Sequence, residues 1–301
     1  MMKLELIKVV YTLGILSISQ PIFAETTEHL KEMVGEPGRG EIIFHVSGCG
    51  SCHSDPDQDD DVKGRPVLSG GYRFETEFGV FIAPNITPHP VAGIGSWSID
   101  NFYVALHDGV SPSDEHYYPV FPYTSYRRML ATDIVDLKAF LDTLPISDKL
   151  NQPHELSFPY SIRAGLKVWK LLYLNKRPNV IFEDNNQQLF RGQYLVEGPG
   201  HCGECHTPRT RLGGPDYSRW LAGGDNPDGE GSIPNITPHK DGIGAWEEID
   251  IASYLENGFT PEYDAVGGSM AEVVENTAKL TEEDRLAIAV YLKFVSAVAS
   301  E

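Results

Sequence analysis

The sequence predicts a mainly α-helical fold built from two tandem, homologous domains with long irregular loops. An internal repeat is the first observation, because the hexapeptide Pro-Asn-Ile-Thr-Pro-His occupies residues 84–89 and again residues 234–239. The second observation is that apolar residues recur at helical spacing in matching places of both copies. The third is that glycine and proline collect between those segments, where they interrupt regular structure.

Further matched pairs extend the repeat over most of the chain. Gly-Ile-Gly-Ser-Trp at 93–97 recurs as Gly-Ile-Gly-Ala-Trp at 242–246, and an Arg-Gly pair precedes both cysteine motifs described below. We therefore assign residues 25–145 to the first domain and residues 187–301 to the second. Residues 146–186 form a connector that is too apolar for a flexible linker, so we expect it to pack across the domains.

The apolar spacing also locates individual helices. The last helix of the second domain is expected at Glu282–Val295, with Thr281 as its N-cap. Its counterpart in the first domain is expected at Asp133–Leu144, where Pro145 stops it. The other expected helices lie at 41–46, after Trp97, after Trp246 and, in the connector, near 162–172.

Each domain contains one Cys-x-x-Cys-His motif, and the two motifs use all four cysteines of the chain. This order is typical of c-type haem attachment, since each thiol adds to one vinyl group and the next residue becomes the proximal iron ligand. We predict two covalently bound haem c groups, each in a class I cytochrome c-like domain. The predicted attachment and proximal residues are Cys49, Cys52 and His53 in the first domain, and Cys202, Cys205 and His206 in the second.

A four-cysteine zinc site is the main alternative for these cysteines. Such a site requires neither histidine, and its pairs usually lie closer together in sequence than Cys49 and Cys202. The acidic run at 55–61 is interpreted as a solvated loop, with a calcium site as its alternative.

Charge and the N-terminus limit the partners and the compartment. The chain has 43 Asp and Glu against 24 Lys and Arg, a formal net charge of −19 that argues against nucleic acid. Acidity fits either solubility alone or steering toward a basic partner. Residues 1–24 resemble a secretory signal peptide cleaved near Ala24, which predicts a periplasmic protein. An uncleaved anchor is the alternative, but the apolar run is short for a membrane span.

Methionine is the usual sixth ligand of an electron-transfer haem c. Met270 lies 64 residues after His206 in a Gly-Gly-Ser-Met segment before the last helix, and we predict that it ligates the second iron. Met129, 76 residues after His53, is the predicted ligand of the first iron. The two positions do not align in the repeat, so His107, His116 or an open site remain alternatives for the first haem.

Other repeated polar residues are candidates for supporting roles. We expect His89 and His239 to cap loops or bind haem propionates, and His45 and His201 to lie on the surface. Pro208 is the expected carbonyl partner of His206. The candidate propionate contacts are Arg39, Arg191, Trp97, Trp246, Asn85 and Asn235.

Together with Tyr-Pro-Val-Phe-Pro-Tyr at 118–123 and Gly-Ser-Met-Ala-Glu-Val-Val at 268–274, the repeated motifs resemble a specific family. It is the multihaem cytochrome c subunit of bacterial membrane-bound alcohol and gluconate dehydrogenases. The resemblance covers nearly all of the mature chain and implies electron transfer from a quinoprotein or flavoprotein dehydrogenase to ubiquinone or another carrier. This chain has two haem motifs where that family usually has three, and it shows no obvious C-terminal anchor.

We therefore predict a one-electron relay, and not an enzyme, with a dehydrogenase subunit as donor and a quinone, cytochrome or oxidase as acceptor. The apolar connector is also a candidate for contact with a partner or for peripheral association with a membrane. The alternative function is a dihaem enzyme, either a cytochrome c peroxidase or a thiosulfate-oxidising cytochrome. A peroxidase would need an open position at one iron.

Overall fold

The computed structural model describes residues 29–56, 62, 64–175, 177–183, 185–226 and 231–300. The predicted signal peptide at 1–24 lies outside these residues, as does most of the acidic run at 55–61. The described chain is mainly helical, as predicted, with little sheet. Across the described part of the chain, no helix has both the length and the apolar character needed to cross a membrane.

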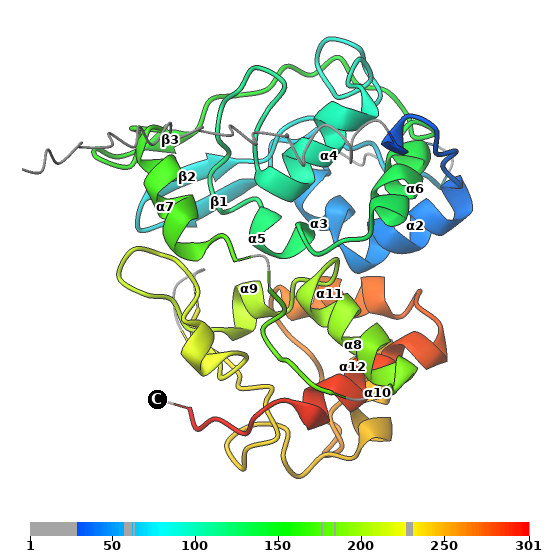
Figure 1. The fold of residues 1–301 in the computed structure, drawn as a ribbon, viewed down its shortest axis with the longest axis vertical. Helices are drawn as coiled ribbons and strands as arrows, with labels where there is room; N and C mark the ends of the chain where they lie inside the picture. The colour runs from blue at the N-terminus through cyan, green and yellow to red at the C-terminus, as the bar shows by residue number, and fades with distance from the viewer. Residues whose placement is uncertain are drawn as a thin grey trace, which may run out of the picture.

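The N-terminal half packs around one hydrophobic core. Its helices are α2 (Pro37–Val46), α3 (Cys49–His53), α4 (Ile99–Asp108), α5 (Tyr123–Tyr126) and α6 (Ala131–Leu141), with α2 lying along α6 (Figure 1). Strands β1 (Arg73–Thr76) and β2 (Gly79–Ile82) form a hairpin to which β3 (Glu155–Leu156) adds antiparallel. The buried core includes Phe44, Leu68, Ile94, Phe102, Leu106, Met129, Ile134, Leu137 and Leu141.

The C-terminal half repeats this arrangement around a second core. Its helices are α8 (Gln187–Glu197), α9 (Gly203–His206), α10 (Glu248–Asn257), α11 (Met270–Thr277) and α12 (Glu282–Phe294). Strands β4 (Gly224–Asp225) and β5 (Ser232–Ile233) pair antiparallel, after a 3-10 turn at Tyr217–Arg219. Helix α8 packs on α12 and α10 on α12. The core includes Leu189, Leu195, Val196, Leu221, Ile251, Leu255, Ala289, Tyr291 and Leu292.

Helix α7 (Gly165–Tyr173) of the connector contacts both halves. The Lys170 ammonium donates to the carbonyls of Asp108 (2.6 Å) and Gly109 (2.8 Å) in the N-terminal half. On the other side, the Trp169 indole donates to the carbonyl of Leu212 at 3.0 Å. Helix α7 is therefore hydrogen-bonded to both halves, and it begins three residues C-terminal to the expected start.

Most predicted helices occur with small shifts at their ends. Thr281 caps α12 by accepting a hydrogen bond from the backbone NH of Asp284, as predicted. The expected helix at 41–46 begins four residues earlier, because Pro37 is favourable in the first turn of a helix. Helix α11, which begins at Met270, was not predicted.

Matched ion pairs join the first and last helices of each half. Arg39 binds Asp136 through two hydrogen bonds of 2.7 and 3.0 Å, and Arg191 binds Asp284 in the same way at 2.7 and 2.8 Å. The sequence did not predict these ion pairs, and contact of the two arginines with haem propionates stays a prediction. Each guanidinium is already engaged by a carboxylate whose position, nearly 100 residues away, gives no signal in the local sequence.

The glycine after each arginine lets the paired helices come close. A Cβ added at Gly40 would lie 2.0 Å from the carbonyl oxygen of Asp136, and one added at Gly192 would lie 1.9 Å from that of Ala287. Both distances are far below van der Waals contact, and in each case the obstructing atom belongs to backbone. The repeated Arg-Gly pair thus fixes the closest helix contact in each half.

We predict that Gly40→Ala lowers the free energy of unfolding by about 1–3 kcal/mol, because the added methyl group forces α2 away from α6. Urea unfolding of the haem-loaded protein measures the change. The matched control is Gly38→Ala in the same helix, where an added Cβ meets nothing within 4 Å. The control should be neutral or slightly stabilising, and equal destabilisation by both substitutions would contradict the prediction.

Candidate functional site

Helices α3 and α9 carry the two Cys-x-x-Cys-His motifs in matching positions of the two halves. A left-handed residue precedes each motif, Gly48 at φ 58° and His201 at φ 38°. The residue after the first cysteine is glycine in both, and it packs under an aromatic ring. A Cβ at Gly50 would lie 3.3 Å from Phe44, and one at Gly203 would lie 2.0 Å from Trp220.

Each motif histidine is oriented by a proline carbonyl from the repeated hexapeptide. Nδ1 of His53 lies 2.8 Å from the oxygen of Pro84, and Nδ1 of His206 lies 2.8 Å from that of Pro234. A carbonyl can only accept, so Nδ1 carries the hydrogen and Nε2 presents its lone pair. The expectation that Pro208 orients His206 is wrong, since the Pro208 oxygen accepts from the backbone NH of Asp216 at 2.8 Å.

Burial and this hydrogen bond have opposite effects on the pKa of each imidazole. Burial lowers the pKa of His53 and of His206, and the bond to the proline carbonyl offsets only part of that effect. Both rings are therefore held neutral at neutral pH, which is the protonation state of a histidine that binds a metal.

The asparagine of each hexapeptide fixes the loop that presents the proline. The Asn85 amide donates to the carbonyls of Ser147 and Lys149, both at 2.9 Å, and its oxygen accepts from Thr87. Asn235 binds the Val298 carbonyl (2.7 Å) and Thr237 in the same way. These asparagines, predicted to contact propionates, are fully engaged within the protein instead.

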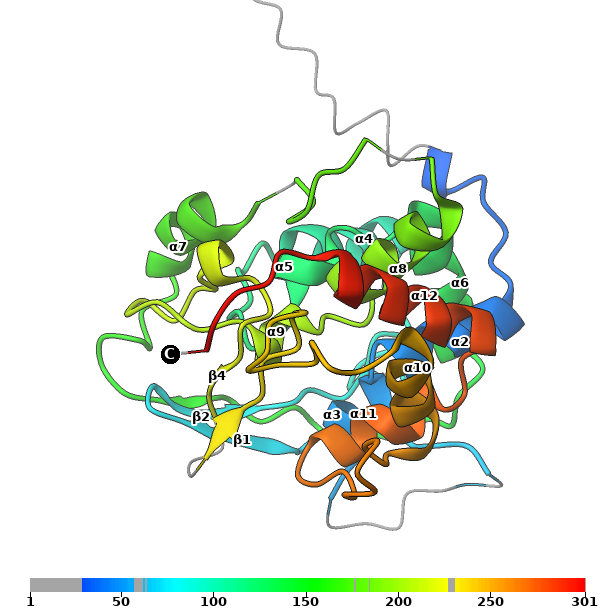
Figure 2. The same ribbon diagram turned by 90° about the horizontal axis from the view of Figure 1, so that it is seen from below.

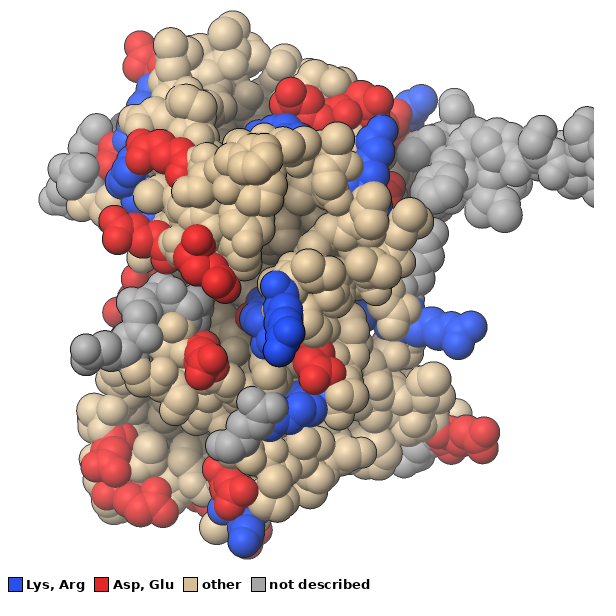
Figure 3. Space-filling view, turned by 90° about the vertical axis from the view of Figure 1, so that its left-hand side faces the viewer, with Lys and Arg blue, Asp and Glu red and all other residues tan. Residues whose placement is uncertain are grey.

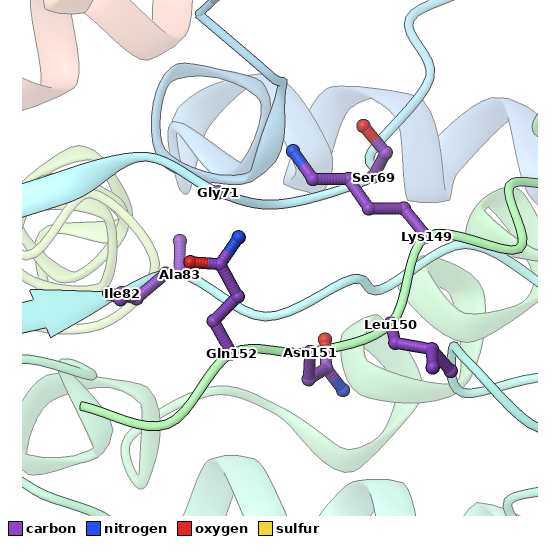
Figure 4. Close-up of a pocket in the computed structure, with 8 residues that line it drawn as sticks. All are labelled: Ser69, Gly71, Ile82, Ala83, Lys149, Leu150, Asn151 and Gln152. Atoms are coloured by element: carbon purple, nitrogen blue, oxygen red, sulfur yellow. The ribbon is translucent and has the colours of Figure 1, made fainter.

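Figure 4 shows the packing beside this loop in the N-terminal half. Residues 149–152 run alongside Ile82 and Ala83, and the Lys149 side chain crosses toward Ser69 and Gly71. The Lys149 ammonium donates to Asp55 and, at 3.0 Å, to the carbonyl of Gly70. Gly70 in turn donates its NH to the carbonyl of His53 at 2.7 Å, so the histidine backbone is tied to the same network.

The two candidate methionines lie in different local structures. Met129 is 5% exposed and belongs to the first core, together with Cys49, just before α6 begins. Met270 is the first residue of α11 and packs, half-buried, against the second core, which Cys202 also contacts. Each methionine therefore shares a hydrophobic core with the first cysteine of its own half.

The alternative histidine ligands have other partners. Nδ1 of His107 lies 2.9 Å from Asp108, and its ring stacks on Tyr103. Nδ1 of His116 lies 2.9 Å from the Lys170 ammonium on α7. His89 accepts backbone hydrogen bonds from Val91 and Ala92, as expected for a loop cap.

The two cysteine motifs meet at the junction between the halves. Burial, and after it the nearby Glu272 and Cys205, raise the pKa of Cys52 to about 11. The Asn276 amide on α11 donates to Ser51 at 3.2 Å, which joins α11 to α3 directly. Figure 2 shows α3 and α11 beside one another from below. Cys52 and Cys205, which are 153 positions apart in sequence, are thus close enough in the fold to interact electrostatically.

Tyr126 and His201 fill the space between the motifs. The Tyr126 hydroxyl donates to the Ser47 carbonyl at 3.0 Å, and Nε2 of His201 lies 3.2 Å from the same oxygen. Their rings meet edge to face at 5.6 Å. The expectation that His201 and His45 lie on the surface is wrong, because both are in the junction, with Nδ1 of His45 3.4 Å from Asn276.

Glu204, inside the second motif, ties the halves together. Its carboxylate accepts from the hydroxyls of Thr124 and, at 3.1 Å, Ser125 on α5 and is paired with Arg209 at 2.8 Å. Burial alone would raise the pKa of Glu204, but Arg209 and Thr124 outweigh it and the pKa is lowered. Sequence reasoning missed this residue, although an acidic residue inside an attachment motif was visible.

The residues of both motifs fit a covalent haem c. In each half two cysteines one helical turn apart, a histidine with a free Nε2 and a core methionine belong to one compact unit. The four cysteines are not joined in disulfides. In the described residues no cluster of three or more His, Cys, Asp or Glu side chains could hold a metal ion, so a four-cysteine zinc centre is not formed.

No family model matches the chain. It is 55% identical over 267 residues to a dihaem c-type cytochrome of Cereibacter sphaeroides, which covers 88% of both chains. The chain belongs to the dihaem c-type cytochromes. Two covalently bound haem c groups with iron follow from this membership, as the sequence predicted.

Cytochrome subunits of dehydrogenases are also similar. The identity is 35% over 283 residues with the fructose dehydrogenase cytochrome subunit of Gluconobacter japonicus, covering 92% of this chain. It is 34% over 271 residues with the cytochrome c subunit of a quinone-dependent alcohol dehydrogenase of Gluconobacter oxydans, covering 86% of this chain. This chain spans only 56% and 55% of those two subunits. The family resemblance inferred from the motifs is thus confirmed.

We predict that Glu204→Gln lowers the free energy of unfolding by about 1–3 kcal/mol at neutral pH, since the amide replaces a buried charged acceptor of two hydroxyls and Arg209. Thermal or urea unfolding of the haem-loaded protein measures this. Glu77→Gln, at an exposed turn between β1 and β2, is the control and should leave stability unchanged. A free energy of unfolding that Glu204→Gln leaves unchanged would contradict the role given to this carboxylate.

Proposed function

We propose that the chain is a periplasmic dihaem cytochrome that relays single electrons between a dehydrogenase and a downstream acceptor. The observation that carries the proposal is the junction, where hydrogen bonds join the surroundings of the two motifs: Asn276 on α11 donates to Ser51 inside the first motif, and Thr124 on α5 donates to Glu204 inside the second. Haem c supplies one-electron redox chemistry at iron. The protein supplies attachment and orientation, and it holds the two motif-bearing halves in one fixed arrangement.

We assign the same roles to matching residues in each half, taken as two class I cytochrome c-like domains. Cys49 and Cys52, and Cys202 and Cys205, attach the porphyrins, while His53 and His206 bind the irons through Nε2. Met129 and Met270 provide the sixth ligands. The assignment of Met129 is supported by its burial in the core that Cys49 also contacts.

Closed coordination at both irons favours a carrier over an enzyme, since no position is left for substrate. The donor is proposed to be a dehydrogenase subunit, because similar chains are named as cytochrome subunits of fructose, alcohol and gluconate dehydrogenases. The acceptor is a quinone, cytochrome or oxidase. Export by a signal peptide cleaved near Ala24 is part of the proposal, because haem c is attached outside the cytoplasm in bacteria.

We predict that Met270→Ala, in the haem-loaded protein, creates carbon monoxide binding at one haem per chain and lowers the midpoint potential of that haem. The reason is that removal of the thioether opens a position and loses a ligand that favours the reduced iron. Met129→Ala should do the same at the first haem. Reduced-minus-oxidised and carbon monoxide difference spectra measure both effects.

The control for the methionine variants is Met33→Ala, since Met33 precedes both motifs. The control and the unaltered protein should bind no carbon monoxide. Carbon monoxide binding by the unaltered protein, together with peroxide turnover, would contradict the carrier function and favour a peroxidase.

The partner is tested by purifying the haem-loaded protein from its native cells and identifying the dehydrogenase that accompanies or reduces it. We expect anaerobic reduction of both haems by that dehydrogenase and its substrate. The net charge of −19 predicts slower reduction at high salt, because screening weakens attraction to a basic docking site. Isolation without any dehydrogenase able to reduce the haems would contradict the proposal.

A further inference from the structure

Helix α7 is unusual because both of its faces are apolar. Its inner face packs Leu166 into a small cluster with Phe81 and Tyr118, and Trp169 lies edge-on to Tyr123. The outer face, where a helix on a protein surface is normally polar, carries leucines that are 86% exposed at 171 and 63% exposed at 172. Val168, one turn before Leu172, is 60% exposed.

A loop of the C-terminal half extends this apolar face. Leu212, 61% exposed, has its carbonyl bound by the Trp169 indole at 3.0 Å. Tyr173, at the end of α7, is hydrogen-bonded to Thr210 at 2.7 Å in the same loop. The exposed leucines therefore come from two segments that are held rigidly together. We define the α7 face as Lys167, Val168, Leu171, Leu172, Arg211 and Leu212.

The charge of this region is opposite to that of the whole protein. Residues 156–182 contain five Lys and Arg and no Asp or Glu, and residues 205–215 contain two Arg and no acid, in a chain of net charge −19. Lys167, Arg177 and Arg211 are exposed. The neighbouring β1–β2 hairpin carries the exposed acidic side chains Glu75 and Glu77. The turn of this hairpin lies next to the connector, because its Phe78 ring packs on Tyr160.

Figure 3 looks onto the side of the molecule where α7 lies in Figure 1. Uncharged side chains occupy much of this view, Lys and Arg lie near its centre with Asp and Glu beside them, and further charges of both signs lie toward its edges. Exposed leucines with basic neighbours are the combination that binds the surface of an anionic bilayer, where the apolar groups enter the headgroup region and the cations meet the phosphates.

We propose that the α7 face docks this cytochrome on an anionic lipid surface. The acidic remainder of the protein is repelled by such a surface, so docking orients the molecule with α7 toward the lipid. Binding of this kind is peripheral and reversible, and it requires no spanning helix. It is separate from the relay function, because vesicle binding by the haem-loaded protein needs no dehydrogenase.

The test is sedimentation of the mature, haem-loaded protein with lipid vesicles. Vesicles of phosphatidylcholine that contain phosphatidylglycerol should bind the protein, vesicles of phosphatidylcholine alone should bind it more weakly, and added salt should release it. The double variant Leu171→Gln, Leu172→Gln should weaken binding to the anionic vesicles about tenfold or more, because two leucine side chains no longer leave water. Lys167→Gln should weaken it about fivefold.

Val34→Gln is the matched control, since Val34 is 85% exposed and precedes α2 by three residues, and α2 lies on the opposite side of the molecule from α7 in Figure 1. It should bind vesicles as the unaltered protein does. Equal binding by the leucine double variant, or no preference for anionic vesicles, would overturn the proposal. Absence of vesicle binding with slower reduction of the leucine variant by its dehydrogenase would overturn it too and assign the face to a protein partner.

Discussion

The hydrogen bond from each motif histidine to a proline carbonyl is the constraint around which each half is organised. It fixes the ring and its tautomer, and so leaves Nε2 with the lone pair that the proposed iron ligation requires. The carbonyl must itself be held still, which explains why Asn85 and Asn235 are buried and fully hydrogen-bonded to segments that follow the last helix of their half. The repeated hexapeptide thus positions the carbonyl oxygen of its first proline, Pro84 in one half and Pro234 in the other.

The packing of the halves follows from the need to place two such sites together. Polar groups link them at the junction, beside Val46 of α2, which packs into the second core: Thr124 and Ser125 bind Glu204, and Tyr194 donates to Asp133. Away from the motifs, the carboxylate of Glu197, 1% exposed, lies 3.5 Å from Arg128. Directional bonds of this kind define one relative orientation, because an unpaired buried polar group is costly. A relay between two redox groups requires that orientation to be constant.

Local patterns predicted what local sequence can encode. The cysteine motifs, the helical spacing and the Thr281 cap each depend on residues within a few positions, and the dihaem cytochrome family followed from them. The errors and omissions share a different cause. The partners of Arg39 and Arg191 and the burial of His201 depend on residues about 100 to 150 positions away. A backbone carbonyl, such as that of Pro234, has no residue-type signal at all, so Pro208 was an equally reasonable expectation.

The asymmetry between the methionines also has a structural basis. In the C-terminal half α11 occupies the segment before the last helix, starts at Met270 and contacts α2 of the other half. In the N-terminal half the same place holds the shorter α5, whose Tyr126 reaches into the junction and whose Thr124 and Ser125 bind Glu204. Because the side chains of α5 make contacts at the junction, the methionine that packs in the first core is Met129, which lies just after α5 in the chain. The repeat has therefore diverged where the two copies touch, because the contacts between the halves place different demands on the matching segments.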